Sequence, residues 1–221
     1  MAITFAQNVH GGNTNDTSYI VNIAGTTAGN LVVVAVGSGD GSYINVTSVV
    51  DSAGNPYIQA TGARTDSAFD MGTDIWYSKN VLGGATTVTV TAVAYVKLIA
   101  SVYEFAGASI TAPFVSAVNQ QSTTGSTGPA LTPASADTVI VGVAFNYNYN
   151  YNPSSATAPF IGVRDNTVTG FASAYQIDAA QSSQQCIFLP STQLTNWASS
   201  AAIFTADVVA SGNTSSMFLV F

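Results

Sequence analysis

Hydrophobic and polar residues alternate over much of the chain. In residues 85–94, Val88, Val90 and Ala92 fall on one face of an extended chain, and threonines fall on the other. Residues 138–146 build an apolar row on one face, made of Val139, Val141, Val143 and Phe145. No sustained apolar stripe occurs at helical spacing, so the pattern predicts β-strands throughout the chain.

Turn-forming residues separate these runs at intervals of roughly ten residues. Gly, Asp, Asn, Ser and Pro gather at residues 39–42, 51–56, 82–84 and 211–213. About a dozen short strands spaced in this way are typical of a sandwich or a barrel. We therefore expect an all-β protein, with a single large antiparallel jelly-roll-like β-sandwich.

The run Leu-Val-Val-Val-Ala-Val at residues 31–36 does not alternate. A strand that is apolar on both faces must be covered on both faces. Two arrangements would achieve this. Either the strand is central in the sandwich with a loop above it, or it lies at a contact between subunits.

The second half of the chain weakly repeats the first at a spacing near 100 residues. Leu31 and Thr138 each begin a hydrophobic strand after a turn of small residues. Three further pairs of segments look alike: residues 46–51 and 160–165, residues 74–78 and 174–178, and residues 98–106 and 198–206.

One alternative is that β segments of similar composition simply look alike. If the repeat is real, two interpretations of it remain. The halves could be two tandem sandwiches joined by the Ser/Thr/Gly/Pro-rich residues 120–133. Alternatively, each half contributes matching strands to one sandwich, which we favour because each half alone offers only about five or six strands, with little to cover its second face. The chain is then a single domain, residues 1–221, with halves at about 18–106 and 128–206.

The repeat leaves an extra C-terminal strand, residues 214–221. Its last five residues are all apolar: Met217, Phe218, Leu219, Val220 and Phe221. An exposed strand of this composition promotes aggregation, so we expect it to be paired. It either closes a sheet of its own chain or reaches a neighbouring subunit.

Composition excludes several functions. Of 221 residues, 47% are hydrophobic and 7% charged, and four Lys and Arg against eleven Asp and Glu give a net charge of -7. So few cations cannot neutralise a row of phosphates, and we expect neither nucleic acid nor a membrane as partner. The N-terminus lacks the basic and hydrophobic regions of a secretory leader, so we expect none.

Candidates for catalysis are few. His10 is the only histidine and no G-x-S-x-G motif occurs, so its His-Gly-Gly segment is interpreted as a surface turn. Glu104 is the only glutamate. It could act as a catalytic acid, but we expect a structural carboxylate at a sheet edge or paired with a cation: Arg64, Lys79, Lys97 or Arg164. Cys186 is interpreted as a buried small hydrophobe, and we expect no enzymatic activity and no cofactor.

Calcium remains an open possibility because it needs only oxygen ligands. Asp66, Asp70 and Asp74 lie in one polar segment, and Asp40 lies in a glycine-rich turn. Neither segment matches the calcium-loop pattern D-x-[DN]-x-[DN]-G. We expect ordinary turns at both places and assign no metal.

Asparagine and tyrosine alternate strictly in residues 146–152. On an extended chain Tyr147, Tyr149 and Tyr151 lie on one face. Tyrosine offers a rigid area and a hydroxyl at low entropic cost, which suits sugar stacking or protein contacts. The alternative is a loop whose tyrosines lie on the surface of their own domain.

Seven segments together resemble a jelly-roll-like β-sandwich domain of bacteriophage virion structural proteins and bacterial surface proteins. They are TTAGNLVVVAV, VTSVVDSAGNPYIQA, DIWYSKNVLGGATTVTVT, VYEFAG, SADTVIVGVAF, SAYQI and WASSAAIFTA. The resemblance covers about residues 18–206 and consists of strand and turn patterns. It implies packed antiparallel sheets and contains no catalytic signature.

The function expected from these patterns is a non-enzymatic virion structural protein. It would be a capsid decoration (cement) protein or a tail or fibre component, located in the virion. Its partners would be copies of itself, as a homotrimer, and other virion proteins such as the major capsid protein. The alternative is an extracellular carbohydrate-binding or adhesive module that meets host surface glycans.

Overall fold

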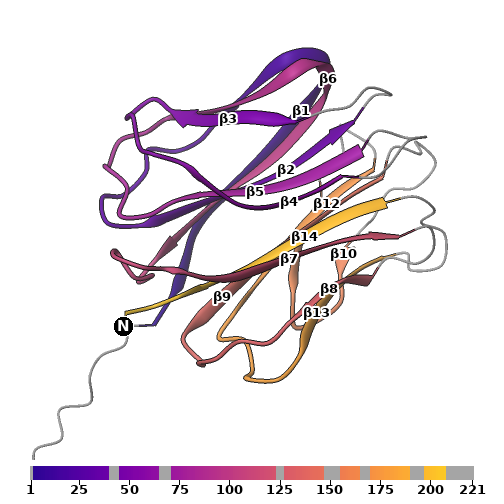
Figure 1. Ribbon diagram of the computed structural model, residues 1–221. Coiled ribbons are helices and arrows are strands. Elements are labelled where there is room, and N and C mark those ends of the chain that lie inside the picture. Colours follow the sequence, from indigo (N-terminus) through magenta and orange to yellow (C-terminus); the bar gives the residue numbers. More distant parts are fainter. Residues whose placement is uncertain are drawn as a thin grey trace, which may run out of the picture.

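The computed structural model describes residues 2–39, 45–64, 71–122, 127–146, 155–164, 170–189 and 197–207. Within these ranges the chain forms fourteen strands (Figure 1). Every pairing between them is antiparallel. The prediction of an all-β antiparallel sandwich is confirmed.

Three sheets build the sandwich. The first has the order β1 (Thr4–Asn22), β6 (Thr87–Ala106), β2 (Leu31–Gly39), β5 (Met71–Ser78) and β4 (Ile58–Arg64), with β3 (Val46–Asp51) also paired to β6. The second has the order β11 (Ile161–Arg164), β12 (Phe171–Ile177), β9 (Thr138–Asn146), β14 (Trp197–Thr205) and β7 (Phe114–Ser122). The third has the order β10 (Ser155–Ala156), β13 (Gln184–Leu189) and β8 (Thr127–Leu131).

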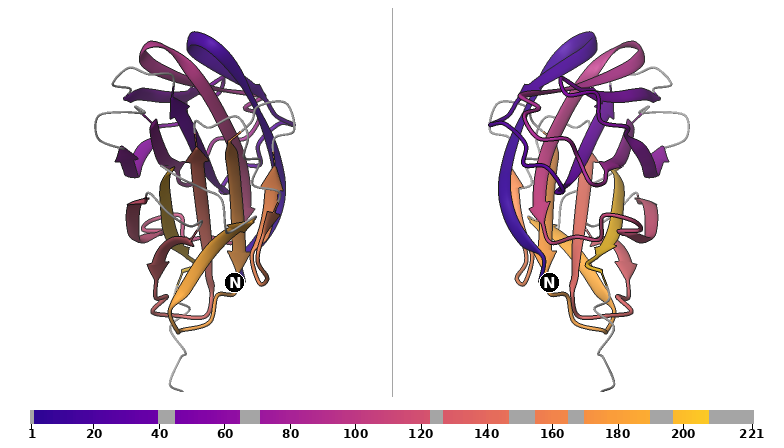
Figure 2. Two further views of the ribbon diagram at one scale, coloured as in Figure 1. Left: turned by 90° about the vertical axis from the view of Figure 1, so that its right-hand side faces the viewer. Right: turned by 90° about the vertical axis from the view of Figure 1, so that its left-hand side faces the viewer.

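Three hydrophobic cores separate these layers. The central core lies between the first two sheets and includes Val33 of β2 and Val141 of β9. A second core lies on the other face of β2, because the long β1–β6 ribbon curves over it (Figure 2). The third lies between the second sheet and β13, and it contains Cys186. Strands β2 and β9 are consequently buried at every position.

Residues 31–36 therefore need no neighbouring subunit. Val32 and Val34 pack in one core with Val88 and Val90 of β6, while Val33 faces the central core. The strand is central, as one of the two interpretations proposed, but strands rather than a loop cover it. The alternative of a subunit contact at this strand is wrong.

The two main sheets have the same plan. Strands β1, β6, β2, β5 and β4 of the first correspond in order to β7, β14, β9, β12 and β11 of the second. The pair Val33–Tyr77 corresponds to Val141–Tyr175. Three residues after each tyrosine the backbone adopts a positive φ, 47° at Asn80 and 54° at Asp178. The repeat seen in the sequence is thus a repeat of five strands.

The sequence alignment of the halves needs two corrections. Residues 46–51 were matched with residues 160–165, but β3 pairs with β6, and the strand that takes the place of β11 is β4. Leu31 was matched with Thr138, whereas its structural counterpart is Val139. A shift of one residue moves a side chain to the other face of a strand, so letter similarity alone misplaced the register.

Three equivalent aromatic rings on each side bind the halves together, and on one side Tyr103 adds a fourth ring that stacks on Phe105 at 6.0 Å between ring centroids. Phe5 stacks on Tyr175 at 4.9 Å between ring centroids, and Phe105 meets Tyr175 edge-on at 5.7 Å. The counterpart is formed by Phe114, which stacks on Tyr77 at 5.6 Å, and by Phe204, which meets Tyr77 edge-on at 5.3 Å. Each group takes two phenylalanines from one half and a tyrosine from the other, so the central core is built jointly.

Buried hydroxyl groups also cross the central core. Tyr103 of β6 and Ser173 of β12 share a hydrogen bond of 2.6 Å, and Ser173 donates to Ser101 at 2.8 Å. The hydroxyl oxygens of Thr73 of β5 and Ser200 of β14 lie 2.9 Å apart and share a hydrogen bond. Because buried polar groups must be paired, these links favour one alignment of the two sheets.

Candidate contact surfaces

The contact residues proposed from the sequence lie outside the described residues. This holds for Tyr147, Tyr149 and Tyr151, and for the five apolar residues that end the chain, 217–221. Asn146 is the last described residue before the tyrosines. It is buried at the end of β9, pairs with Trp197 of β14 and donates its backbone N–H to the carbonyl of Gly170.

The candidate calcium ligands do not form a site in the described part of the chain. Asp40, Asp66 and Asp70 lie outside it. Asp74 is fully buried in β5 and accepts a hydrogen bond of 2.7 Å from Nε2 of Gln59. No group of three potential metal ligands occurs among the residues that the structure describes.

His10 is exposed, as expected, but it does not lie in a turn. It belongs to β1 and pairs with Ser101 of β6. Gly11 beside it leaves room for the ring of Tyr19, since a Cβ there would lie 2.3 Å from the tyrosine hydroxyl. The His-Gly-Gly segment therefore continues a strand, and the interpretation as a turn is wrong.

Cys186 is buried in the third core. Burial raises the pKa of its thiol well above the ordinary value, because the thiolate would lose its hydration. The reactive form is the thiolate, so a raised pKa makes this cysteine inert. This agrees with the interpretation of Cys186 as a packing residue.

We expect Cys186 to resist thiol reagents in the folded protein at pH 8. The raised pKa keeps the group protonated as the pH rises through the ordinary range for cysteine, and burial blocks access. Labelling with a chromogenic disulfide should stay below a tenth of the chains in buffer and reach one thiol per chain in 6 M guanidinium. Rapid labelling of the folded chain would contradict the buried placement.

Glu104 is a structural acceptor inside the protein. Its carboxylate accepts hydrogen bonds from Nε2 of Gln7 at 2.5 Å, from the backbone N–H of Thr27 at 2.7 Å and from Nδ2 of Asn30 at 2.7 Å. The side chain is 2% exposed. Amide donors thus take the place of the cation expected from the sequence, and they fix the loop that joins β1 to β2.

Lys97, one of the cations considered for Glu104, lies elsewhere. It is buried in β6 with its Nζ 5.7 Å from the ring centroid of Phe145. A cation over an aromatic face is attracted by the ring quadrupole. Lys97 therefore contributes to the central core near the end of β9.

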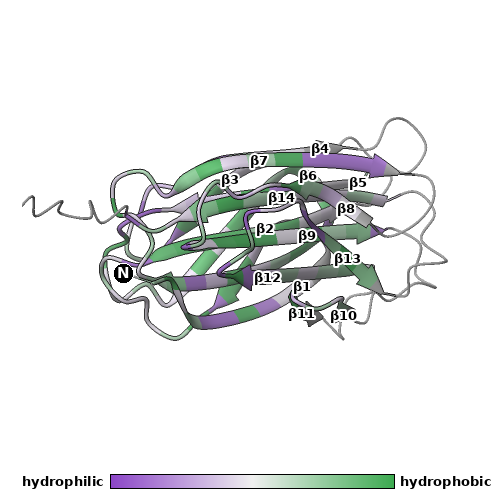
Figure 3. Ribbon diagram, turned by 90° about the horizontal axis from the view of Figure 1, so that it is seen from below, coloured by the Kyte–Doolittle hydropathy of each residue, from purple (hydrophilic) through white to green (hydrophobic). Residues whose placement is uncertain are grey.

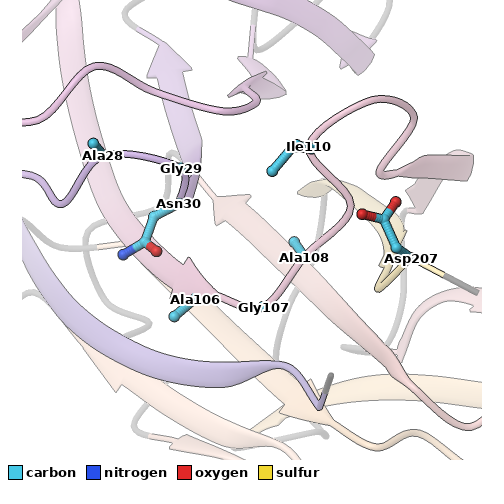
Figure 4. Close-up of a pocket in the computed structure, with 8 residues that line it drawn as sticks. All are labelled: Ala28, Gly29, Asn30, Ala106, Gly107, Ala108, Ile110 and Asp207. Carbon is cyan, nitrogen blue, oxygen red and sulfur yellow. The ribbon is translucent and has the colours of Figure 1, made fainter. Parts of the chain in front are cut away.

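A pocket of about 300 Å³ lies beside the loop that joins β1 to β2 (Figure 4). Its lining residues are small or apolar except for one amide and one carboxylate: Ala28, Gly29, Asn30, Ala106, Gly107, Ala108, Ile110 and Asp207. The amide of Asn30 is committed to Glu104, and Asp207 is exposed at the end of the described chain. The pocket therefore offers little to orient a polar ligand.

Exposed apolar side chains gather at matching places on the two sides of the sandwich. Ile58 of β4 pairs with Tyr77, and Ile161 of β11 pairs with Tyr175. Directly paired residues point to the same face, so both isoleucines face the central core from an edge strand. They nonetheless remain 49% and 55% exposed.

We call these places the first and the second side patch. The first consists of Ile58, Tyr77 and Phe114, and the second of Phe5, Ile161 and Tyr175. Seen from below, β4 and β7 lie on one side and β1 and β11 on the other (Figure 3). Burial raises the pKa of Tyr77 and of Tyr175 alike, which fits their equivalent positions.

Sequence reasoning missed the side patches, although a signal was present. Each patch isoleucine ends a Pro-aromatic-Ile segment, Pro56-Tyr57-Ile58 in the first half and Pro159-Phe160-Ile161 in the second. Phe160 belongs to the third core and Tyr57 packs against the second. The two segments therefore mark equivalent edge strands.

The outer face of the curved ribbon is uncharged at its centre. Ile20 of β1 and Val50 of β3 both pair with Thr89 of β6, and both are about half exposed. Thr87 and Thr91 continue the row along β6. This surface offers methyl and hydroxyl groups but no charge.

Comparison with protein-family models, with curated proteins and with solved structures found no match for the chain. The part of the chain that the structure describes has no helix able to span a membrane. The functional proposal therefore rests on the residues and the geometry of the chain itself.

Proposed function

We propose that the protein is a non-enzymatic structural component of a bacteriophage particle that acts through contacts between subunits. It serves as a capsid decoration (cement) protein, or else as a tail or fibre component. Its location is the virion. Its partners are copies of itself, arranged as a homotrimer, and other virion proteins such as the major capsid protein.

The side patches carry this proposal. In each patch, core-facing apolar residues at the edge of the sandwich stay about half exposed. Covering apolar surface releases about 25 cal/mol for each Å² removed from water, so a neighbour that closes these edges is stabilised there. Matching patches on two sides allow one subunit to meet two neighbours, as a particle coat requires.

Further support comes from the composition and from the resemblance. The chain has a net charge of -7 with only four cations, and uncharged Ser, Thr and Asn are abundant in it. Seven segments within residues 18–206 resemble a domain of virion structural proteins. Residues 31–36 are buried within one chain, so this strand gives no reason to expect assembly. The half-exposed isoleucines of the side patches do give one.

Quantitative mass spectrometry of purified particles tests the proposal. Particles from the source culture are banded on a density gradient and digested, and the peptides of this chain are counted against those of the major capsid protein. We expect a fixed copy number in particle fractions across preparations. Absence from the particles, with the chain found free in the lysate, would overturn the proposal.

A carbohydrate-binding or adhesive module is the second candidate. The observation that favours it is the strict alternation of asparagine and tyrosine in residues 146–152, which on an extended chain puts Tyr147, Tyr149 and Tyr151 on one face. A glycan array with the wild-type chain and with the double variant Tyr147→Ala, Tyr149→Ala decides between the candidates. Binding that the double variant loses supports the module, and silence of the wild type dismisses it.

A further inference from the structure

The two side patches have the same plan but different charges beside them. Tyr77 and Tyr175 hold equivalent places, so the residues after them can be compared position by position. Two residues after Tyr77 stands Lys79, and the second half has an isoleucine there. Three residues after Tyr175 stands Asp178, and the first half has an asparagine there. The first patch is thus flanked by a cation and the second by a carboxylate.

Lys79 reaches across the end of the first patch. Its Nζ donates a hydrogen bond to the carbonyl of Thr111, in the loop that leads to Phe114 and β7. The side chain therefore links the ends of the same two strands whose rings, Tyr77 and Phe114, stack in the patch. Lys79 is exposed, whereas the other lysine, Lys97, is buried. Among the side chains that the structure describes, Lys79 is thus the one exposed cation.

Asp178 is exposed at the end of β12. No ion pair joins it to another described residue, and none joins Lys79 to Asp207, the exposed carboxylate at the end of the described chain. The edge strand beside each patch ends on an arginine, Arg64 in β4 and Arg164 in β11. Because each side has one arginine, the difference in charge between the patches comes from Lys79 and Asp178.

These charges decide how two copies can meet. A net charge of -7 makes copies repel each other in general, so a stable contact needs opposite charges that face each other. Two first patches in contact would bring two lysines together, and two second patches would bring two carboxylates together. A first patch on a second patch brings Lys79 to Asp178 and lets the exposed Ile58 and Ile161 cover each other.

We propose that the first side patch of one copy binds the second side patch of the next copy, with Lys79 facing Asp178 across the contact. The patches lie on different sides of the sandwich, so one copy cannot join its own two patches (Figure 3). Such a contact repeats from copy to copy and forms a ring or a row. The inference rests on the proposed function in one respect, that copies assemble, and it names the surfaces that meet.

Charge reversal in the full-length chain tests this contact. Lys79→Asp places two carboxylates across it and Asp178→Lys places two cations across it. Each should lower the association constant, measured by sedimentation equilibrium, at least about tenfold. The double variant Lys79→Asp, Asp178→Lys restores opposite charges, so its association constant should return to within about threefold of the wild-type value.

Two control variants separate facing charges from net charge and from folding. Asp16→Lys changes the net charge just as Asp178→Lys does, on an exposed residue far along β1 from Phe5. It should not weaken association, because a smaller negative charge lowers general repulsion. Asp178→Asn removes the charge and suits the positive φ of 54° there, as Asn80 does in the first half. It should weaken association while the melting temperature stays unchanged.

Three results would refute the contact. If Lys79→Asp weakens association and Asp178→Lys does not, the first patch meets some surface other than the second. A double variant that stays dissociated at the wild-type melting temperature shows that the two residues do not face each other. A wild-type chain that sediments as a single copy at every concentration excludes a second copy as the partner. Presence in particles is measured independently, so this contact and the virion function can fail separately.

Discussion

Phe105→Ala and Phe204→Ala should each lower the free energy of unfolding by about 3–5 kcal/mol, and by nearly the same amount. Both rings are fully buried, and they hold equivalent places in the two aromatic groups. Each removal leaves a cavity beside a tyrosine from the other half of the chain. Urea unfolding followed by tryptophan fluorescence measures the loss.

The control for this pair is Ile20→Ala, a large apolar residue that is 52% exposed on the outer face. It should change the free energy of unfolding by less than about 1 kcal/mol, since exposed substitutions rarely cost more. If the losses of unfolding free energy in Phe105→Ala and Phe204→Ala differ by more than about 2 kcal/mol, the two halves are not energetically equivalent. A single unfolding transition is expected for each variant, because the core is shared.

Strand β9 could be predicted closely from alternation. Residues 138–146 were identified as a strand with Val139, Val141, Val143 and Phe145 on its inner face, and the structure has β9 at those residues with that row in the central core. The period of two residues is set by the backbone itself, so a regular pattern translates directly into side-chain direction.

Strand β1 could not be predicted in this way. Its middle part, NVHGGNTND, is rich in residues that usually favour turns, and His10 was placed in one. Pairing with β6 over fifteen residue pairs overrides this local preference. Strand propensity depends on the partner strand more than on the residues themselves, and the partner lies about ninety residues away.

The side patches depend on a property that a single strand does not carry. Ile58 and Ile161 look like ordinary buried strand residues in the sequence. They are exposed because β4 and β11 are edge strands, and that place follows only from the order of strands in each sheet. The two Pro-aromatic-Ile segments identify the side patches only when β4 and β11 are known to be edge strands.

The burial of apolar residues within the chain explains how a chain with few charged residues can be covered without a partner. The most apolar run, residues 31–36, is covered by strands of the same chain, so high hydrophobicity by itself does not require assembly. Exposed apolar side chains remain at the sheet edges, on the uncharged outer face and in two loops, at Leu82 and Ile110. Assembly is therefore argued from where apolar side chains stay exposed, and not from how many there are.

Glu104→Ala should lower the free energy of unfolding by about 2–4 kcal/mol, the second largest effect expected. The carboxylate accepts hydrogen bonds from Gln7, Thr27 and Asn30. Its removal takes this acceptor from Thr27 and Asn30 in a buried site, while Nε2 of Gln7 keeps its hydrogen bond to the carbonyl of Ala24. Glu104→Gln should fall between wild type and Glu104→Ala, because the amide keeps one acceptor but turns its NH₂ group toward other donors.

Hydrogen exchange at the Thr27 amide gives a local measure of the same contact. In the wild-type chain this amide donates to Glu104 at 2.7 Å and should be protected, whereas in Glu104→Ala it should exchange at least tenfold faster. Asp207→Ala serves as control, since that carboxylate is exposed and its loss should cost less than about 0.5 kcal/mol. If Glu104→Ala were as harmless as Asp207→Ala, the loop between β1 and β2 would be held by its hydrogen bonds to residues 81–86, which involve the backbone and the hydroxyl of Thr26. The carboxylate at the centre of the amide cluster would then have no structural role.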